Sequence, residues 1–272
     1  MGVDVIARVF ILLKNWKTLL TAESISFKFK VVYFFSLLTT LPFKKYVFWL
    51  GDRFYVDGRL AALLLPSYLD EIKYLLSEAP DDQNNFFILD VGANIGQFAY
   101  NFLYFKPDSI IISVEPNTKI IPLLEKNLTR FGERWKLLKV AVGPTTKKSN
   151  FYFVEGKSSQ GSLIEANANF NLLKQNLVVS LEIIEVPLTS ETFLAETGLT
   201  INKFYLIKID VEGYEKRALQ GLLGLKTKYC WVETIKDRSG GLSFTEAALL
   251  VNESFGELSG SEQNGSNSLF RF

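Results

Sequence analysis

The most constraining feature of the sequence is an alternation of strand and helix patterns that begins at residue 86. Residues 86–91 read Phe-Phe-Ile-Leu-Asp-Val, a largely apolar run typical of a strand buried on both faces of a parallel sheet. A turn with two glycines follows, and residues 97–105 then have phenylalanines at helical spacing. Further strands are expected at 109–114, 136–142, 203–210 and 229–233, and further helices at 122–130 and 214–223. This alternation predicts an α/β fold with a doubly wound, mostly parallel sheet.

The carboxyl-terminal segment predicts a different connection. Residues 255–258 and 268–272 are apolar stretches that flank a Gly/Ser/Asn-rich turn, a pattern typical of an antiparallel hairpin. With this hairpin, the expected fold is a Rossmann-like sheet of seven strands. A helical pattern around 69–76 and a polar loop at 78–85 precede the first strand, so we divide the chain into 1–85 and a main domain at 86–272.

The first part, residues 1–85, is predicted to be a basic, aromatic-rich helical extension. Its first 50 residues carry seven basic and two acidic side chains, a net charge of +5 in a chain whose total is +1. The same 50 residues contain eleven aromatic side chains. Such a segment suits an anionic membrane surface or an acidic partner. The favoured interpretation is a set of helices that pack on the main domain and cover a substrate site, with the lysines in solvent.

The composition excludes several classes of site and partner. The chain has no histidine, which removes histidine general bases, Ser-His-Asp triads and histidine-ligated metals. A single cysteine, Cys230, excludes a disulfide framework and a thiolate zinc site. The near-neutral net charge argues against a nucleic-acid partner. The longest uncharged run, 31–43, is shorter than the roughly 20 residues of a membrane span. We therefore expect a soluble, cytoplasmic protein whose contact with a membrane would be peripheral.

A candidate cofactor site lies at the carboxyl ends of the first two predicted strands, where open α/β sheets bind ligands. Gly92 and Gly96 let the backbone approach a ligand, and the start of the following helix offers free N–H groups for an anion. Glu115 follows about 20 residues later, where a carboxylate can accept hydrogen bonds from both hydroxyls of a ribose. Together with Asp90, which can accept from an ammonium group, these features suit S-adenosylmethionine. A dinucleotide is disfavoured because two of the three glycines of its G-x-G-x-x-G fingerprint are absent.

Three segments carry a resemblance to a known family. They are Asp90-Val-Gly-Ala-Asn-Ile-Gly-Gln-Phe98, Val114-Glu-Pro-Asn117 and Leu206-Ile-Lys-Ile-Asp-Val-Glu-Gly-Tyr-Glu215. In order and spacing they closely resemble the FkbM-type methyltransferases, a class I family that uses S-adenosylmethionine and mostly methylates hydroxyl groups of sugars, polyketides and related small molecules. The resemblance implies that Asp90, Gly92, Asn94 and Gly96 line the methionine end of the cofactor, and that Glu115 and Asn117 lie on the ribose and adenine side.

The sequence departs from the family pattern at two places. Many members carry Glu-Val-His near the end of the fifth strand, whereas this chain reads Trp231-Val-Glu-Thr-Ile235, with Ile235 at or near the histidine position. The Leu-Asp usual before the fourth strand is replaced around residues 191–193. These departures leave the cofactor site intact and place the identity of the general base in question.

Transfer to a hydroxyl requires alignment with the sulfonium and a base that takes the hydroxyl proton. Asp210, at the tip of the fourth strand, is the first candidate base, and Glu212 and Glu233 are further catalytic candidates. A divalent metal held by Asp210 and Glu212 is a second interpretation of these carboxylates. A third is a capped helix start with no catalytic role, in which Glu215 is favoured by the helix dipole.

Two further segments concern the substrate side. Lys208 lies inside a predicted buried strand, where a cation needs a partner, so we expect it to neutralise Asp90 as a structural ion pair. The polar stretch 155–163 is expected over the acceptor, with Ser159 and Gln160 as candidate substrate ligands, although such stretches also serve as simple connectors. The Asn/Asp-Pro-Pro-aromatic motif of amino-group methyltransferases of DNA is absent from this strand end, which favours an oxygen acceptor.

The expected function is therefore an S-adenosylmethionine-dependent O-methyltransferase that acts on a glycan or another small hydroxylated metabolite. Two alternatives stay open: a degenerate, non-catalytic binding protein of the same fold, and a peripheral membrane protein that docks through residues 1–85. The sequence does not specify an oligomeric state.

Overall fold

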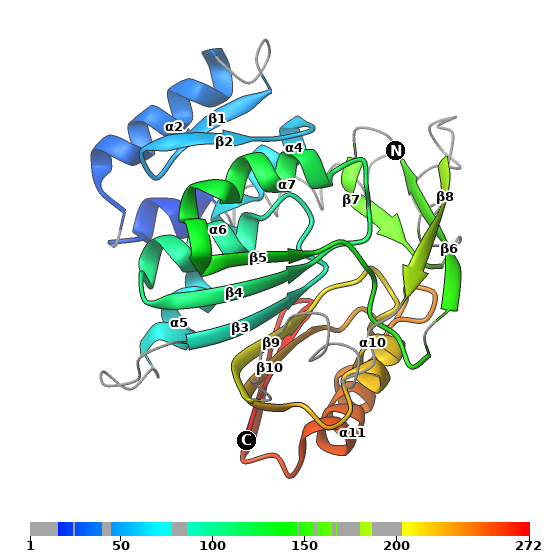
Figure 1. Cartoon of the computed structure of the whole chain (residues 1–272). Coiled ribbons are helices and arrows are strands. Elements are labelled where there is room, and N and C mark those ends of the chain that lie inside the picture. Colours follow the sequence, from blue (N-terminus) through cyan, green and yellow to red (C-terminus); the bar gives the residue numbers. More distant parts are fainter. Residues whose placement is uncertain are drawn as a thin grey trace.

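The computed structural model describes residues 16–23, 25–39, 45–77, 86–145, 147–154, 157–164, 167, 180–186 and 203–272. A seven-stranded sheet forms its centre, in the order β11-β12-β10-β9-β3-β4-β5 (Figure 1). The strands are β3 (Phe86–Val91), β4 (Ser109–Val114), β5 (Trp135–Leu138), β9 (Lys203–Ile209), β10 (Lys226–Glu233), β11 (Gly260–Asn264) and β12 (Asn267–Arg271). The inner pairs are parallel, and β12 runs antiparallel to both of its neighbours. The predicted α/β sheet with a closing antiparallel hairpin is confirmed.

Two predicted strands differ from the observed ones. The third parallel strand ends at Leu138 rather than at residue 142, and residues 140–142 instead border a cavity described below. The strand predicted at 255–258 is wrong, because helix α11 (Phe244–Phe255) occupies its start and the first hairpin strand begins only at Gly260. The capping box of Ser243 and Glu246 begins this helix, and the Ser-x-x-Glu spacing was its signal in the sequence.

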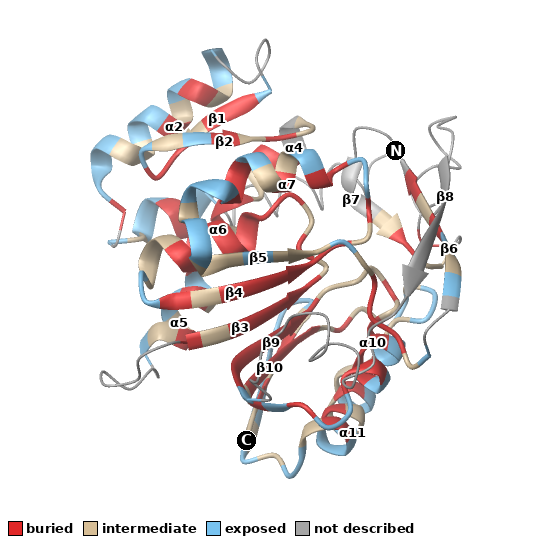
Figure 2. Ribbon diagram, viewed as in Figure 1, coloured by how far each residue is buried: buried red, intermediate tan, exposed pale blue. Residues whose placement is uncertain are grey.

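Helices cover both faces of the sheet and produce two hydrophobic cores. On one face lie α6 (Gln97–Phe105) and α7 (Ile121–Leu128), and on the other lie α10 (Glu215–Gly221) and α11. Figure 2 shows buried residues along the sheet and along the inward sides of these helices. The inner strands β3, β4, β9 and β10 are therefore buried on both faces, which is why their sequences read as largely apolar runs, whereas the edge strand β11 is polar and exposed.

The predicted extension shares a core with the sheet. It contains α2 (Phe27–Thr39), α4 (Arg59–Leu63), the 3-10 helix η1 (Leu65–Tyr68) and α5 (Leu69–Ser77). It also contains an antiparallel hairpin of β1 (Tyr46–Trp49) and β2 (Asp52–Tyr55), so it is not purely helical as predicted. Buried side chains of the extension such as Tyr33, Trp49 and Phe54 belong to the same cluster as Ile88 and Phe98. This shared cluster joins the two parts of the chain that we divided at residue 85.

An insertion between β5 and β9 forms a second small sheet. Strands β6 (Lys147–Val154), β7 (Lys157–Ser162) and β8 (Ser180–Val186) pair antiparallel in the order β7-β6-β8. Figure 1 shows this sheet beyond the carboxyl ends of β4 and β5. Across the described ranges, no helix is both long and apolar enough to cross a bilayer.

Candidate active site

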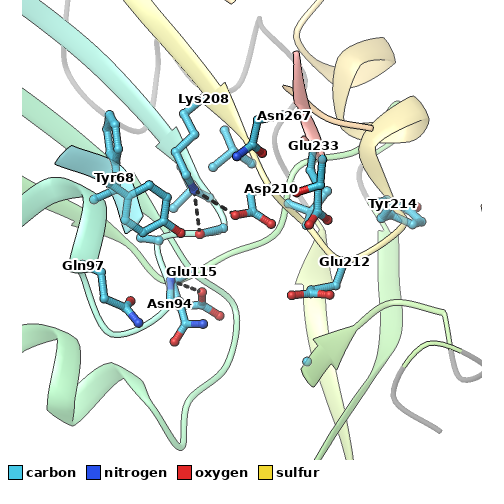
Figure 3. A pocket seen from close by; sticks show the side chains of 18 of the residues that line it. Tyr68, Asn94, Gln97, Glu115, Lys208, Asp210, Glu212, Tyr214, Glu233 and Asn267 are labelled. Carbon is cyan, nitrogen blue, oxygen red and sulfur yellow. Dashed lines mark hydrogen bonds and ion pairs between the residues drawn. The ribbon is translucent and has the colours of Figure 1, made fainter. Parts of the chain in front are cut away.

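A cavity of about 340 Å³ lies at the carboxyl ends of the parallel strands. Seven of the predicted site residues line it: Gly92, Asn94, Glu115, Asn117, Asp210, Glu212 and Glu233. In Figure 3, Asn94 and Glu115 lie on one side of the cavity, Glu212 and Glu233 lie on the other, and Asp210 lies between them. The sheet thus brings the predicted cofactor residues and the predicted catalytic residues into one space.

The turn after β3 depends on two glycines with different roles. Gly92 has φ +80°, and a Cβ atom there would lie 1.9 Å from the backbone oxygen of Asp210, so only glycine fits. Gly96 has φ +91° and is not part of the cavity lining. A Cβ on Gly96 would instead meet Leu124 and Leu128 of α7 at 3.0 Å, so this glycine allows α7 to pack against the turn.

Glu115 is buried and held in place by backbone donors. Its two carboxylate oxygens accept hydrogen bonds from the backbone N–H groups of Asn94 at 2.8 Å and Asn117 at 2.9 Å. Burial raises the pKa of Glu115 to about 7, although these two hydrogen bonds oppose the shift. Each carboxylate oxygen retains acceptor capacity, which suits a ligand with two adjacent hydroxyls.

Asp90 lies behind the cavity rather than in its lining. It is fully buried on β3 directly opposite Lys208 on β9, and the Lys208 Nζ lies 3.0 Å from its Oδ1. Burial lowers the pKa of Lys208, but Asp90 and Asp210 raise it more strongly, so it stays above its usual range. The predicted ion pair of Lys208 and Asp90 is confirmed. Lys208 itself lines the cavity, so the positive charge, and not the carboxylate of Asp90, faces the ligand.

The loop after β9 presents the candidate catalytic carboxylates. Glu212 has φ +55° and Gly213 has φ +96°, a left-handed pair that turns the chain sharply. Glu215 stabilises this turn, because its Oε1 accepts hydrogen bonds from the backbone N–H groups of Val211 at 3.2 Å and Gly213 at 2.9 Å. The Asp210 carboxylate is one-quarter exposed and lies 3.7 Å from the Lys208 ammonium. It is therefore accessible from the cavity and has a cation beside it.

Arg238 joins the two glutamates on this side of the cavity. Its Nη1 lies 2.9 Å from the Glu212 Oε2 and also forms an ion pair with Glu233. Burial raises the pKa of Glu212 to about 8 even though Arg238 opposes the shift. Burial, with the neighbouring Asp210 and Glu212, also raises the pKa of Glu233 well above its usual range. Both glutamates are thus paired with Arg238, whereas the Asp210 carboxylate is accessible from the cavity. Sequence reasoning missed Arg238, which lies in a loop without a recognisable motif.

The extension supplies another wall of the cavity. The ring of Tyr68 lies edge-on to Phe98 at 5.9 Å and to Trp231 at 5.8 Å. The Thr18 hydroxyl donates a hydrogen bond of 2.8 Å to the Asp70 carboxylate, and both residues line the cavity. None of these contacts was predicted, because each joins segments that are distant in sequence.

Residues 90–253 match the family described as the methyltransferase FkbM domain, which covers more than half of the chain. The chain belongs to the FkbM methyltransferase family. Among curated proteins, it is similar to Methyltransferase 1 of Beauveria bassiana (strain ARSEF 2860), with 26% identity over 165 residues. That alignment covers 55% of this chain and 62% of the fungal protein, so the chain spans less than two-thirds of that relative.

Solved methyltransferase structures are similar at low identity. The magnesium protoporphyrin IX methyltransferase of Synechocystis PCC 6803, with bound S-adenosylmethionine, has 7% identity and a TM-score of 0.44, covering 76% of this chain and 77% of its own. A methyltransferase from Aquifex aeolicus that depends on S-adenosylmethionine has 11% identity and a TM-score of 0.43, covering 75% of this chain and 91% of its own.

The cavity of this FkbM domain fits S-adenosylmethionine, the methyl donor of the family. Gly92 leaves room for close approach, and Glu115 is fixed with spare acceptor capacity. The cavity volume of about 340 Å³ falls within the usual range for small-molecule sites. In this site Glu115 and Asn117 would hold the ribose and adenine side, and Gly92 and Asn94 the methionine end.

The predicted acceptor residues are only partly described. Gly161 and Leu163, at the end of the predicted substrate stretch, line the cavity. The Ser162 hydroxyl donates a hydrogen bond of 2.9 Å to the Glu212 carbonyl, which connects β7 to the loop after β9. The side chains of Ser159 and Gln160 lie outside the described part of the structure, as do residues 191–193.

A second cavity of about 280 Å³ adjoins the first. The two share Asp70, Glu71, Asn264 and Asn267, so the second cavity lies between α5 and the β11–β12 hairpin. Its lining adds polar residues, Glu262 and Gln263, and apolar or aromatic ones, Tyr74, Leu75, Trp231 and Leu269.

A metal site is a further interpretation of the carboxyl groups in this cavity. Within the described ranges, no group of three or more His, Cys, Asp or Glu side chains is arranged to hold a metal ion. Asp210 and Glu212, the pair predicted as metal ligands, each have a cation beside them, Lys208 and Arg238 respectively. Both carboxyl groups thus already have a partner within the protein.

Proposed function

We propose that this protein transfers a methyl group from S-adenosylmethionine to a hydroxyl oxygen of a glycan or another small hydroxylated metabolite. The main observation behind this proposal is that one cavity is lined both by the fixed Glu115 carboxylate and by the accessible Asp210 carboxylate. The near-neutral net charge of +1 supports a small-molecule or glycan acceptor rather than a nucleic acid.

When bound, S-adenosylmethionine supplies an electrophilic methyl group. Glu115 and the turn at Gly92 would hold the donor, and the acceptor oxygen would approach from the side of Asp210. The Asp210 carboxylate would accept the proton that the hydroxyl loses when it is methylated. Lys208, 3.7 Å from Asp210, holds this carboxylate in position.

The second cavity supports the choice of acceptor. Carboxylates and amides are hydrogen-bond partners for hydroxyl groups, and the rings of Tyr74 and Trp231 offer apolar faces beside them. A ligand that combines hydroxyl groups with an apolar surface fits this lining better than an anionic one, because Asp70 and Glu71 would repel negative charge, whereas Glu262 is paired with Arg271.

Cofactor binding is tested with S-adenosylhomocysteine, the product of the donor. At about 100 times its Kd, it should raise the melting temperature of the wild-type protein by about 5–10 °C. Glu115→Ala should abolish this rise, and Glu133→Ala, at an exposed position, should retain it. A rise that survives in Glu115→Ala would contradict the assigned cofactor site.

Catalysis is tested with a radiolabelled methyl donor and a library of hydroxylated acceptors. We expect methyl transfer to at least one acceptor, and a decrease of about 10²–10⁴-fold in Asp210→Asn with the melting-temperature rise retained. Cofactor binding without transfer to any acceptor would favour the non-catalytic alternative instead.

A further inference from the structure

Exposed large apolar side chains are concentrated at one end of the molecule. Leu223 and Leu249 are scattered examples elsewhere, with exposed fractions of 43% and 68%. The others lie on helical residues 16–21 and on α2: Trp16, Leu20, Phe27, Val31, Val32, Phe35 and Leu38. The Trp16 ring meets Phe34 of α2 with centroids 4.2 Å apart, so the two segments lie side by side. We call these seven side chains the apolar face.

Most of the apolar face lies on the outward side of α2. Phe27, Val31, Phe35 and Leu38 follow one another at intervals of four, four and three residues, so they project from one side of the helix. Phe27, Phe35 and Leu38 are 80%, 65% and 77% exposed. Tyr33, by contrast, is buried, and its ring lies 5.0 Å from that of Trp49. A helix that is apolar on both sides is typical of a buried helix, yet only its inward side is covered by the described residues.

The charge around the apolar face is positive. Lys17 and Lys28 are exposed at its edge, and Lys30 donates a hydrogen bond of 2.8 Å to the Leu20 carbonyl, which ties the two segments together. Glu23 is the single acidic residue in the sequence from 16 to 39. The chain from residue 51 onward carries a net charge of −4. The net positive charge is therefore confined to residues 1–50, the part of the chain that bears the apolar face. Figure 1 shows α2 at the edge of the molecule, beyond β1, and Figure 2 shows exposed residues along it.

We propose that the apolar face docks on an anionic lipid bilayer. The 13 residues of α2 span about 20 Å, less than the roughly 30 Å of a bilayer core, so the helix lies in the plane of the interface and does not cross it. Exposed aromatic and aliphatic side chains enter the headgroup region, and the lysines contact the anionic headgroups. Thr18, on the same short helix as Trp16 and Leu20, lines the cavity, so docking brings the cavity wall close to the lipid surface.

The test is co-sedimentation of the full-length protein with vesicles. Wild-type protein should sediment with vesicles of phosphatidylcholine and phosphatidylserine. It should sediment less with vesicles of phosphatidylcholine alone. It should also sediment less at high salt, because salt screens the attraction between the lysines and the anionic headgroups. The double variant Phe35→Ser/Leu38→Ser should reduce binding by about tenfold. Leu249→Ser, at a similarly exposed leucine on α11, is the matched control and should bind as the wild type does.

A charge variant keeps the test decisive if the serine variant folds poorly, as judged by circular dichroism. Lys17→Glu/Lys28→Glu should reduce binding to the anionic vesicles and leave the melting temperature unchanged, because both lysines are exposed. Absence of wild-type sedimentation, or sedimentation of both double variants to the same extent as wild type, would overturn the proposal. So would a wild-type dimer that the serine variant dissociates, without vesicle binding, because a second copy would then cover the face. The assay needs neither cofactor nor turnover, so its outcome is independent of the methyl-transfer proposal.

Discussion

Three residues of the cavity wall have backbone in the left-handed region, with φ of +80° at Gly92, +54° at Asn94 and +55° at Glu212. For residues other than glycine this conformation costs about 1–2 kcal/mol. The surrounding hydrogen bonds hold it in place: the backbone N–H of Asn94 donates to Glu115, and Glu215 accepts from the turn at Glu212. Of the four non-glycine residues with positive φ in the described ranges, Asn94 and Glu212 thus line the cavity, whereas Lys45 and Leu50 lie at the β1–β2 hairpin.

Gly92→Ala tests how much of this geometry depends on the missing Cβ. The added atom would lie 1.9 Å from the Asp210 backbone oxygen, so the strands must move apart. We expect a loss of about 4 kcal/mol or more in the free energy of unfolding, measured by urea denaturation, together with loss of cofactor binding. Gly132→Ala is the control, because Gly132 has φ +58° and open space around it. It should cost only the backbone strain, about 1–3 kcal/mol. Equal losses in the two variants would show that the contact with Asp210 is unimportant.

At the scale of elements, the hairpin β1–β2 is attached to the sheet by Asn127 of α7. The Asn127 side chain accepts a hydrogen bond of 2.7 Å from the Tyr55 N–H and donates one of 2.9 Å to the Tyr55 carbonyl. It also donates one of 2.8 Å to the Ile95 carbonyl in the turn after β3. One amide group therefore connects the hairpin, α7 and the turn after β3, which borders the candidate cofactor site.

Asn127→Ala should destabilise the protein by about 2 kcal/mol, because it leaves backbone groups of Tyr55 and Ile95 without partners. Amide hydrogen exchange should accelerate in β2 more than in β10, which Asn127 does not contact. Asn150→Ala, at an exposed asparagine, should change the free energy of unfolding by less than about 0.5 kcal/mol. Uniform acceleration across both strands would argue against a local role in hairpin attachment.

At the scale of the whole molecule, several carboxyl groups are buried, and burial raises their pKa. Burial raises the pKa of Glu115 to about 7 and of Glu212 to about 8, from an ordinary value of 4.5, and it also raises that of Glu233. Between the ordinary and the raised values, the folded protein binds more protons than the unfolded chain. The free energy of unfolding should therefore fall as pH rises from about 4.5 to about 8.

Glu212→Gln tests this pH dependence, because glutamine resembles the protonated side chain. Compared with wild type, the variant should lose less stability between pH 5 and pH 8, by up to about 1 kcal/mol per pH unit. Glu246→Gln is the control, since hydrogen bonds from Ser243 hold the pKa of Glu246 below its usual range, outside this window. If the free energy of unfolding changes with pH in the same way in wild type and in Glu212→Gln, the raised pKa of Glu212 is refuted. Urea denaturation across this pH range provides the measurement.

The parts that were predictable from sequence are those in which the signal is local. The parallel strands follow from continuous apolar runs, and the Lys208–Asp90 pair follows from charges in two runs that become neighbours in the sheet. The hairpin β1–β2 was missed because its aromatic residues were attributed to helices, although Leu50-Gly51 is a two-residue turn with positive φ at both positions. The link from Arg238 to Glu212 and Glu233 depends on how two loops meet, which no local pattern encodes.

The packing of Tyr68 between Phe98 and Trp231 has a consequence for how this protein diverges. The three rings belong to the extension, to α6 and to β10, and together they are part of the cavity wall and of the structure beneath it. A substitution at any one of them alters the shape of the cavity and the attachment of the extension at the same time. We therefore expect that a change in the shape of this wall needs a compensating change in the packing of the other two rings.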